Sequence, residues 1–242
     1  MVDGDGRFRA LLVDAGGTLF PDSLPDAPGV RQVRARRLAA VLPELGPDRA
    51  AALLDELLAD ARAARDELTQ RSDALIASRL RAVAPALAGR AGDVRRALSR
   101  PTGHEHPPFP GHRDLLLEAG RLGLRRVLVS NTDWVSDEDW VRWRMAERGL
   151  DGLLDDVVTS YSAGRRKPDR SIFDRALTLA GCPPEACVYV GDNEAKDVEP
   201  ALALGMTVIR VAIQEPPTPS RAQRMVTSLP AAIEALRQLT KR

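Results

Sequence analysis

Residues 9–20 have the sequence RALLVDAGGTLF, and this stretch decides the fold that we predict. The apolar run from Ala10 to Val13 is typical of a buried strand, which ends at the carboxylate of Asp14. The two glycines that follow allow the backbone to turn sharply. Because open α/β sheets bind their ligands at the carboxyl ends of central strands, we expect Asp14 to lie in a functional site.

Three further polar elements follow in the chain, each at the end of a predicted strand or just before a predicted helix. In order, they are Ser130 with its neighbour Asn131, then Lys167, then the acids Asp192 and Asp197. Carboxylates are the ligands that Mg²⁺ prefers beside substrate phosphate. A hydroxyl and an ammonium bind phosphoryl oxygens, and a further carboxylate can attack phosphorus. The set therefore favours phosphoryl transfer.

This ordered set resembles the four motifs of the haloacid dehalogenase-like (HAD) superfamily, and the resemblance extends from about residue 9 to the last predicted helix. The segments VSNTD, RKPDRSIFDRAL and VGDNEAKDVEPALALGM resemble the subgroup that carries a helical cap between its first two motifs. The resemblance implies that Asp14 is the nucleophile and that Ser130 and Lys167 complete the catalytic set. The implied Mg²⁺ ligands are Asp14, the Gly16 carbonyl and Asp192; the implied substrate-binding residues are Ser130, Asn131 and Lys167; and Asp197 would support the metal and the lysine.

The predicted fold class is α/β, with a Rossmann-like, doubly wound parallel sheet as the core and an inserted α-helical cap. Pro-rich linkers at residues 21–29 and 101–111 are typical of hinges. Between them, apolar residues recur with a helical period in four segments, and the arginines and acids of the opposite faces are expected in solvent. We assign residues 1–20 and 108–242 to the core and residues 21–107 to the cap, which in the resembled family selects the substrate.

After the second linker, predicted helices and strands alternate, which favours a parallel sheet with helices on both faces. The predicted strands are 126–130, 156–159, 187–190 and 207–211, and the predicted helices are 113–122, 138–148, 171–180 and 198–204. A final helix is expected with Ser228 as its N-cap and Pro230 in its first turn. The tryptophan-rich segment after Ser130 is longer than is usual in the resembled family, so we consider a dimer surface and a specificity element there.

Gly16 is the main departure from the resembled family. Phosphatases of that family usually have a second aspartate at this position, which protonates the leaving oxygen and then activates water. Loss of such acid–base help typically costs about 10²–10⁴ in rate. Acyl, aryl and nitrogen-linked phosphates would suffer less than alkyl phosphates, unless Asp133 or Asp22 replaces the missing acid.

Two other functions remain open at this point. Dehalogenases of the superfamily also lack the second aspartate, because halide leaves without a proton, but they typically lose the first acid of the fourth motif. This chain retains Asp192, which favours phosphoryl chemistry. A non-catalytic HAD-fold binding protein is the alternative of a different class.

The bulk composition fits a small-molecule enzyme. The chain has 242 residues and a formal net charge of +1, so its charge gives no indication of a nucleic-acid or membrane partner. Its N-terminal residues lack the basic and apolar regions of a signal peptide. We expect a cytoplasmic protein, a monomer or a homodimer, that uses Mg²⁺ and acts on a small phosphorylated molecule.

Overall fold

The computed structural model describes residues 8–21, 28–66, 72–102, 106–214 and 216–241. The strands of its central sheet are β1 (Ala10–Val13), β2 (Arg125–Ser130), β3 (Asp156–Thr159), β4 (Cys187–Gly191), β5 (Thr207–Val211) and β6 (Arg224–Val226). All neighbouring strands pair in parallel, in the order β3-β2-β1-β4-β5-β6. This arrangement confirms the predicted parallel α/β fold.

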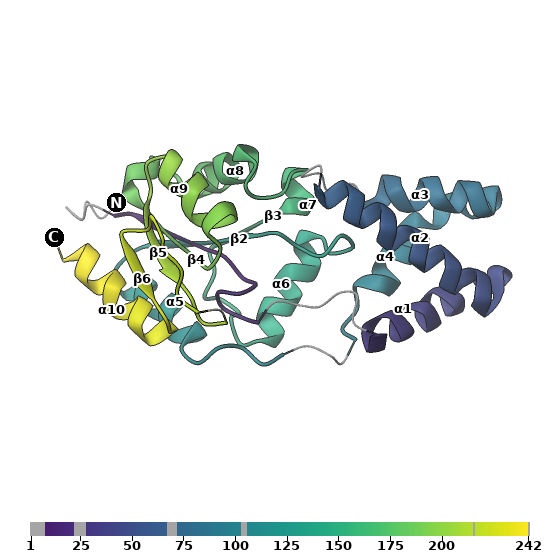
Figure 1. Cartoon of the computed structure of the whole chain (residues 1–242), viewed down its shortest axis with the longest axis horizontal. Coiled ribbons are helices and arrows are strands. Elements are labelled where there is room, and N and C mark those ends of the chain that lie inside the picture. The colour runs from purple at the N-terminus through teal and green to yellow at the C-terminus, as the bar shows by residue number, and fades with distance from the viewer. Residues whose placement is uncertain (1–7, 22–27, 67–71, 103–105, 215, 242) are drawn as a thin grey trace.

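Helices cover both faces of the sheet, as Figure 1 shows. One face carries α5 (His112–Arg121), α6 (Glu138–Glu147) and α10 (Leu229–Thr240), and the other carries α8 (Arg170–Ala180) and α9 (Glu199–Ala203). Leu11 and Val13 enter the first hydrophobic cluster, whereas Ala10 and Leu12 enter the second. Successive side chains of a strand point to opposite faces, so the continuous apolar run of β1 follows from burial on both sides.

The strand register brings the ends of β1, β2 and β4 together. Val13, the last residue of β1, pairs with Leu128 of β2 and with Val190 of β4. The N–H of Asp14 donates to the carbonyl of Val190 over 2.9 Å. The residues that follow these three strands therefore share one edge of the sheet, which is the edge where open α/β folds bind ligands.

The chain between β1 and α5 forms a helical insertion. Its helices are α1 (Pro28–Val41), α2 (Gly46–Asp66), α3 (Ser72–Val83) and α4 (Ala91–Ser99). They share a hydrophobic cluster of their own and lie at one end of the molecule in Figure 1. The predicted hinges fall partly on residues 22–27 and 103–105, which lie outside the described residues. Within the described ranges, no helix is long and apolar enough to cross a membrane.

The segment directly after β2 joins the sheet to the helical insertion. Trp134 is buried within the hydrophobic cluster of the insertion. Asp133 forms an ion pair with Arg34 of α1, and Asp137, the N-cap of α6, forms one with Arg95 of α4. The expectation that arginines of the insertion lie in solvent is wrong for Arg34, which is only 5% exposed. Its pairing explains this, because a buried charge needs a partner.

Three details concern the last third of the chain. β6 is an addition to the prediction, since three residues are too few for periodicity to indicate a strand. A π-helical turn, Glu194–Val198, precedes α9, where the prediction has a helix from Val198 onward. The predicted N-cap of the last helix is confirmed, because the Ser228 hydroxyl accepts from the N–H of Ala231.

We predict that Trp134→Ala lowers the free energy of unfolding by about 3–5 kcal/mol, because truncation of a buried tryptophan leaves a cavity. The side chain is 6% exposed, and its indole N–H has no hydrogen-bond partner among the described residues. Trp134→Phe removes this unpaired donor while it retains most of the packing, so a smaller loss is expected. Urea denaturation followed by circular dichroism measures both values.

The comparison variant is Trp143→Ala, at a tryptophan that is 43% exposed and stacks on Trp140 with ring centroids 4.7 Å apart. Loss of this stack should lower the free energy of unfolding by about 0.5–1.5 kcal/mol, which is less than the loss expected for Trp134→Ala. Equal losses for the two alanine variants would contradict the role of Trp134 as the joint between the sheet and the insertion.

Candidate active site

Segments that are far apart in the sequence meet at the carboxyl edge of the sheet. Asp14 follows β1, Ser130 ends β2, and Lys167 lies between β3 and α8. Asp192 follows β4, and Asp197 lies in the π-helical turn. All of them, together with Gly16 and Asn131, line one pocket of about 490 Å³. The structure thus brings together every residue that the sequence assigns to the site.

Lys167 is the centre of the hydrogen bonds in this site. Its Nζ lies 2.6 Å from Asp14 Oδ1 and 2.6 Å from Asp197 Oδ1, and its side chain is 2% exposed. The Tyr189 hydroxyl lies 3.1 Å from the same Nζ and donates to Asp197 Oδ1 over 2.8 Å. Burial alone lowers the pKa of Lys167, but the neighbouring carboxylates outweigh burial and raise the pKa. The lysine is therefore a fixed positive charge beside Asp14.

The side chain of Asn131 holds the main chain of Lys167. Its Oδ1 accepts from the Lys167 N–H over 2.7 Å, and its Nδ2 donates to the Lys167 carbonyl over 3.1 Å. Both ends of the amide are thus engaged in positioning the lysine. Ser130, which is 6% exposed, lines the pocket beside it. The substrate contacts that the sequence predicts for Ser130 and Asn131 stay predictions.

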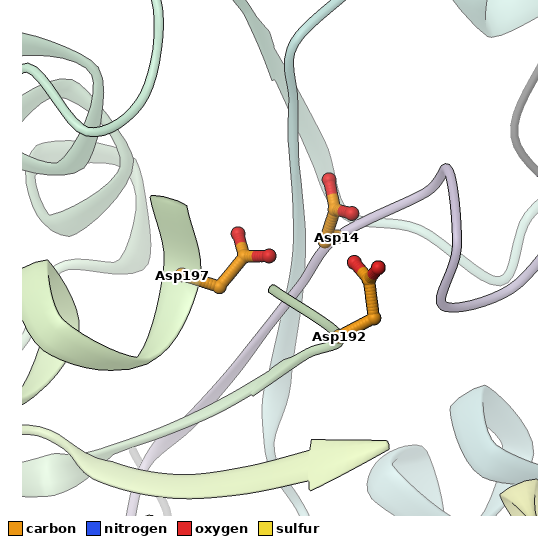
Figure 2. A group of neighbouring side chains, drawn as sticks. All are labelled: Asp14, Asp192 and Asp197. Carbon is orange, nitrogen blue, oxygen red and sulfur yellow. The ribbon is translucent and has the colours of Figure 1, made fainter. Parts of the chain in front are cut away.

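Three carboxylates gather where a metal ion would bind. Figure 2 shows the side chains of Asp14, Asp192 and Asp197 directed toward one another, and one oxygen from each lies within 4.8 Å of the others. Burial raises the pKa of Asp14 to about 7, although Lys167 opposes this rise. When all three carboxylates are ionised, they and the one ammonium leave two negative charges in excess. A divalent cation would neutralise them, and oxygen ligands of this kind suit Mg²⁺, so the residues fit the implied metal.

Two glycines allow these carboxylates to approach one another. Gly17 has φ 73°, and a Cβ there would lie 2.3 Å from Asp192 Oδ2. A Cβ on Gly191 would lie 2.7 Å from the Cβ of Asp197. Both positions require glycine because any side chain would displace an acid of the site, and Gly17 also has the left-handed backbone that glycine tolerates.

Three residues outside the predicted set position the acids. The first is Tyr189, whose hydroxyl holds Asp197. The second is Arg210 of β5, whose Nε donates to the main-chain carbonyl of Asp192 over 2.8 Å. The third is Thr18, whose Oγ1 lies 3.4 Å from Asp192 Oδ1 and 3.5 Å from Asp14 Oδ2. A tyrosine and an arginine inside otherwise apolar strands are the signal that could have indicated the first two.

Neither candidate replacement for the missing acid gains support from the structure. Asp133 lines the pocket, but one carboxylate oxygen is ion-paired with Arg34 and the other accepts from the N–H of Trp134 over 2.8 Å. Both oxygens are therefore engaged in joining the insertion to the sheet. Asp22 lies outside the described residues.

Comparisons with known proteins identify relatives of this chain. The chain is 36% identical over 116 residues to haloacid dehalogenase-like hydrolase domain-containing protein 3 of Xenopus laevis, a match that covers 48% of this chain and 46% of that protein. It is 34% identical over 104 residues to glyceraldehyde 3-phosphate phosphatase of Methanocaldococcus jannaschii, which covers 43% of this chain and 44% of that protein. The chain therefore spans less than half the length of the curated relatives it matches.

The fold has counterparts among solved structures. The structure of 2-haloacid dehalogenase from Pseudomonas syringae pv. Tomato DC3000 superposes with a TM-score of 0.70 over 96% of this chain and 99% of that one, at 19% identity. A likeness at this identity shows the fold alone. The sequence model of the haloacid dehalogenase-like hydrolases, in contrast, matches residues 8–205. Because that match extends over most of the sequence, the chain belongs to the haloacid dehalogenase-like hydrolase family.

Proposed function

We propose that this protein is a Mg²⁺-dependent phosphatase that acts on a small phosphorylated metabolite through an aspartyl-phosphate intermediate. The observation that carries the proposal is the meeting of Asp14, Asp192 and Asp197 with the buried Lys167 in one pocket. Similarity to glyceraldehyde 3-phosphate phosphatases adds support for a small phosphorylated substrate.

In the proposed reaction, a carboxylate oxygen of Asp14 forms a bond to phosphorus while the bond from phosphorus to the leaving oxygen breaks. Water then attacks the aspartyl phosphate, which releases inorganic phosphate and restores the carboxylate. Lys167 and the Ser130 hydroxyl would hold the transferring oxygens, and Asp197 with Tyr189 keeps the lysine in place. A Mg²⁺ ion held by Asp14, Asp192 and the Gly16 carbonyl would supply stabilisation of the phosphoryl charge.

Gly16 determines which leaving groups this proposed enzyme handles best. Glycine retains the main-chain carbonyl but cannot donate a proton to the leaving oxygen. Asp133, the nearest alternative in the sequence, is engaged with Arg34. We therefore propose that acyl and aryl phosphates, whose leaving groups depart without a proton, are turned over faster than alkyl phosphates.

Dehalogenation is the second candidate function, and the arrangement at Gly16 suits it equally well because halide needs no proton. The retained carboxylate of Asp192 in the cluster of three acids favours the phosphatase. Halide release from 2-haloacids in the absence of Mg²⁺ would reverse this preference.

We predict that phosphate release from acetyl phosphate and p-nitrophenyl phosphate requires both Mg²⁺ and Asp14. Asp14→Asn should lower kcat/KM by at least about 10³-fold, because the nucleophile is lost. Treatment with EDTA should abolish release, and added Mg²⁺ should restore it. Asp151→Asn, at an exposed turn residue, is the matched control and should retain wild-type rates. Equal activity of the Asp14 and Asp151 variants would exclude the aspartyl-phosphate mechanism.

We also predict that Gly16→Asp restores the missing acid. The ratio of kcat/KM for glycerol 3-phosphate to kcat/KM for acetyl phosphate should rise by about 10²-fold, because only the alkyl ester needs a proton. Gly16→Asn has a side chain of similar size without the acid, and the ratio should stay at the wild-type value. If the wild type already hydrolyses both substrates at similar rates, and Asp133→Asn removes the alkyl activity alone, then Asp133 is the acid.

A further inference from the structure

One face of α6 lies along the same pocket as the three aspartates. The residues of α6 and its C-cap that line the pocket are Trp140, Val141, Arg144, Met145 and Arg148. Their spacing places them on one side of a helix. The described residues that line this pocket all belong to segments 14–21 and 130–197. The walls of the pocket are thus formed by the core and not by α1 to α4, although the resembled family selects its substrate with the cap.

The arginines of this face are held over aromatic rings. The guanidinium of Arg148 lies 4.1 Å from the centre of the Phe20 ring, and that of Arg144 lies 5.8 Å from the centre of the Trp140 ring. Stacking engages the face of a guanidinium, whereas its N–H donors lie at the edge. Val141 and Met145 are buried in the core beneath them, which fixes the helix. Arg144 and Arg148 are therefore half-buried, and their side chains are restrained by the rings beside them.

The lining of the pocket contains both acids and cations. Lys167 is bound by Asp14 and Asp197, and Asp133 forms an ion pair with Arg34 of α1. The other cations of the lining are Arg144, Arg148, Arg166 and Lys196. With a divalent ion among the carboxylates, the pocket as a whole carries an excess of positive charge. With a phosphoryl group at Asp14, the α6 side of the pocket, which carries Arg144 and Arg148, would face another part of the substrate.

We propose that α6 forms a leaving-group subsite, and that the preferred substrate carries a second oxyanion, a carboxylate or a phosphate, which Arg144 and Arg148 bind. This inference rests on the proposed phosphatase function. A volume of about 490 Å³ suits a small metabolite with two anionic ends. Guanidinium groups bind both oxyanions through paired N–H donors, so the two sources share one recognition chemistry. Trp140 and Met145 would contact the carbon skeleton between the two anions.

The test uses pairs of substrates that differ in one anionic group. The carboxylate arm compares 4-carboxyphenyl phosphate with 4-carbamoylphenyl phosphate, which has nearly the same shape and a neutral amide in place of the carboxylate. The phosphate arm compares 1,4-phenylene bisphosphate with 4-hydroxyphenyl phosphate. Phosphate release is measured with Mg²⁺ for the wild type, Arg144→Gln, Arg148→Gln, Arg148→Lys and Arg142→Gln. Arg142 is exposed on the same helix and is not among the lining residues of the pocket, so its variant is the matched control.

In at least one pair, the wild type should favour the member with the second oxyanion by roughly tenfold in kcat/KM, which corresponds to about 1.4 kcal/mol. Arg144→Gln and Arg148→Gln should each reduce this preference several-fold, mainly through KM. For the member of the pair that lacks the second oxyanion, kcat/KM should stay within about twofold of the wild-type value. Arg148→Lys should retain part of the preference because it retains the charge. The pair whose preference falls in the arginine variants identifies the oxyanion as carboxylate or phosphate. Because the wild type and each variant are compared on the same pair, the intrinsic reactivity of the substrates cancels.

Two outcomes separate this inference from the function on which it rests. Phosphate release from both members of each pair at equal kcat/KM, with the Arg144 and Arg148 variants matching Arg142→Gln, would overturn the subsite and leave the phosphatase intact. Release from none of the four substrates, nor from acetyl phosphate, would overturn the phosphatase itself. Circular dichroism of each variant shows whether it is folded.

Discussion

The buried contact of Lys167 with Asp14 and Asp197 is the interaction on which the rest of the site depends. Removing three charged groups from water is costly, and one ammonium cannot balance the carboxylates gathered there. The remaining excess of negative charge is what makes the site suitable for a divalent cation. The same arrangement fixes the geometry around it: Asn131 holds the lysine main chain, and Tyr189 holds the second carboxylate.

Much of this site could be predicted because each of its residues stands directly after an apolar strand or before a helix. Parallel pairing with matched strand ends then forces Asp14, Ser130 and Asp192 to one edge. Tyr189 and Arg210 could not be placed in advance, since their roles depend on which strands become neighbours and on which face each residue occupies. The burial of Arg34 could not be predicted either, because it follows from a contact with Asp133, 99 positions later in the chain.

The joint between the helical insertion and the sheet lies beside the site itself. The residues that join them, Asp133, Trp134 and Asp137, come only a few positions after Ser130. The Asp133 contact with Arg34 lies three positions after Ser130 and two after Asn131. Tyr161, whose hydroxyl donates to Asp73 of α3 over 2.9 Å, adds a second contact after β3. The insertion is therefore held directly by the segments that follow β2 and β3, beside the predicted phosphate-binding residues.

Gly16 and the cationic face of α6 are consistent with one another within the proposed mechanism. Without an acid at position 16, a leaving oxygen departs with negative charge, and charge of this kind is stabilised by fixed cations in a poorly solvated pocket. Leaving groups that depart readily as anions need this stabilisation least, which is why Gly16 would favour acyl and aryl phosphates. Arg144 and Arg148 are restrained over aromatic rings, so they would bind a second oxyanion with little reorganisation. The two features would thus act on different parts of one substrate: Gly16 on the leaving group, and α6 on the second oxyanion.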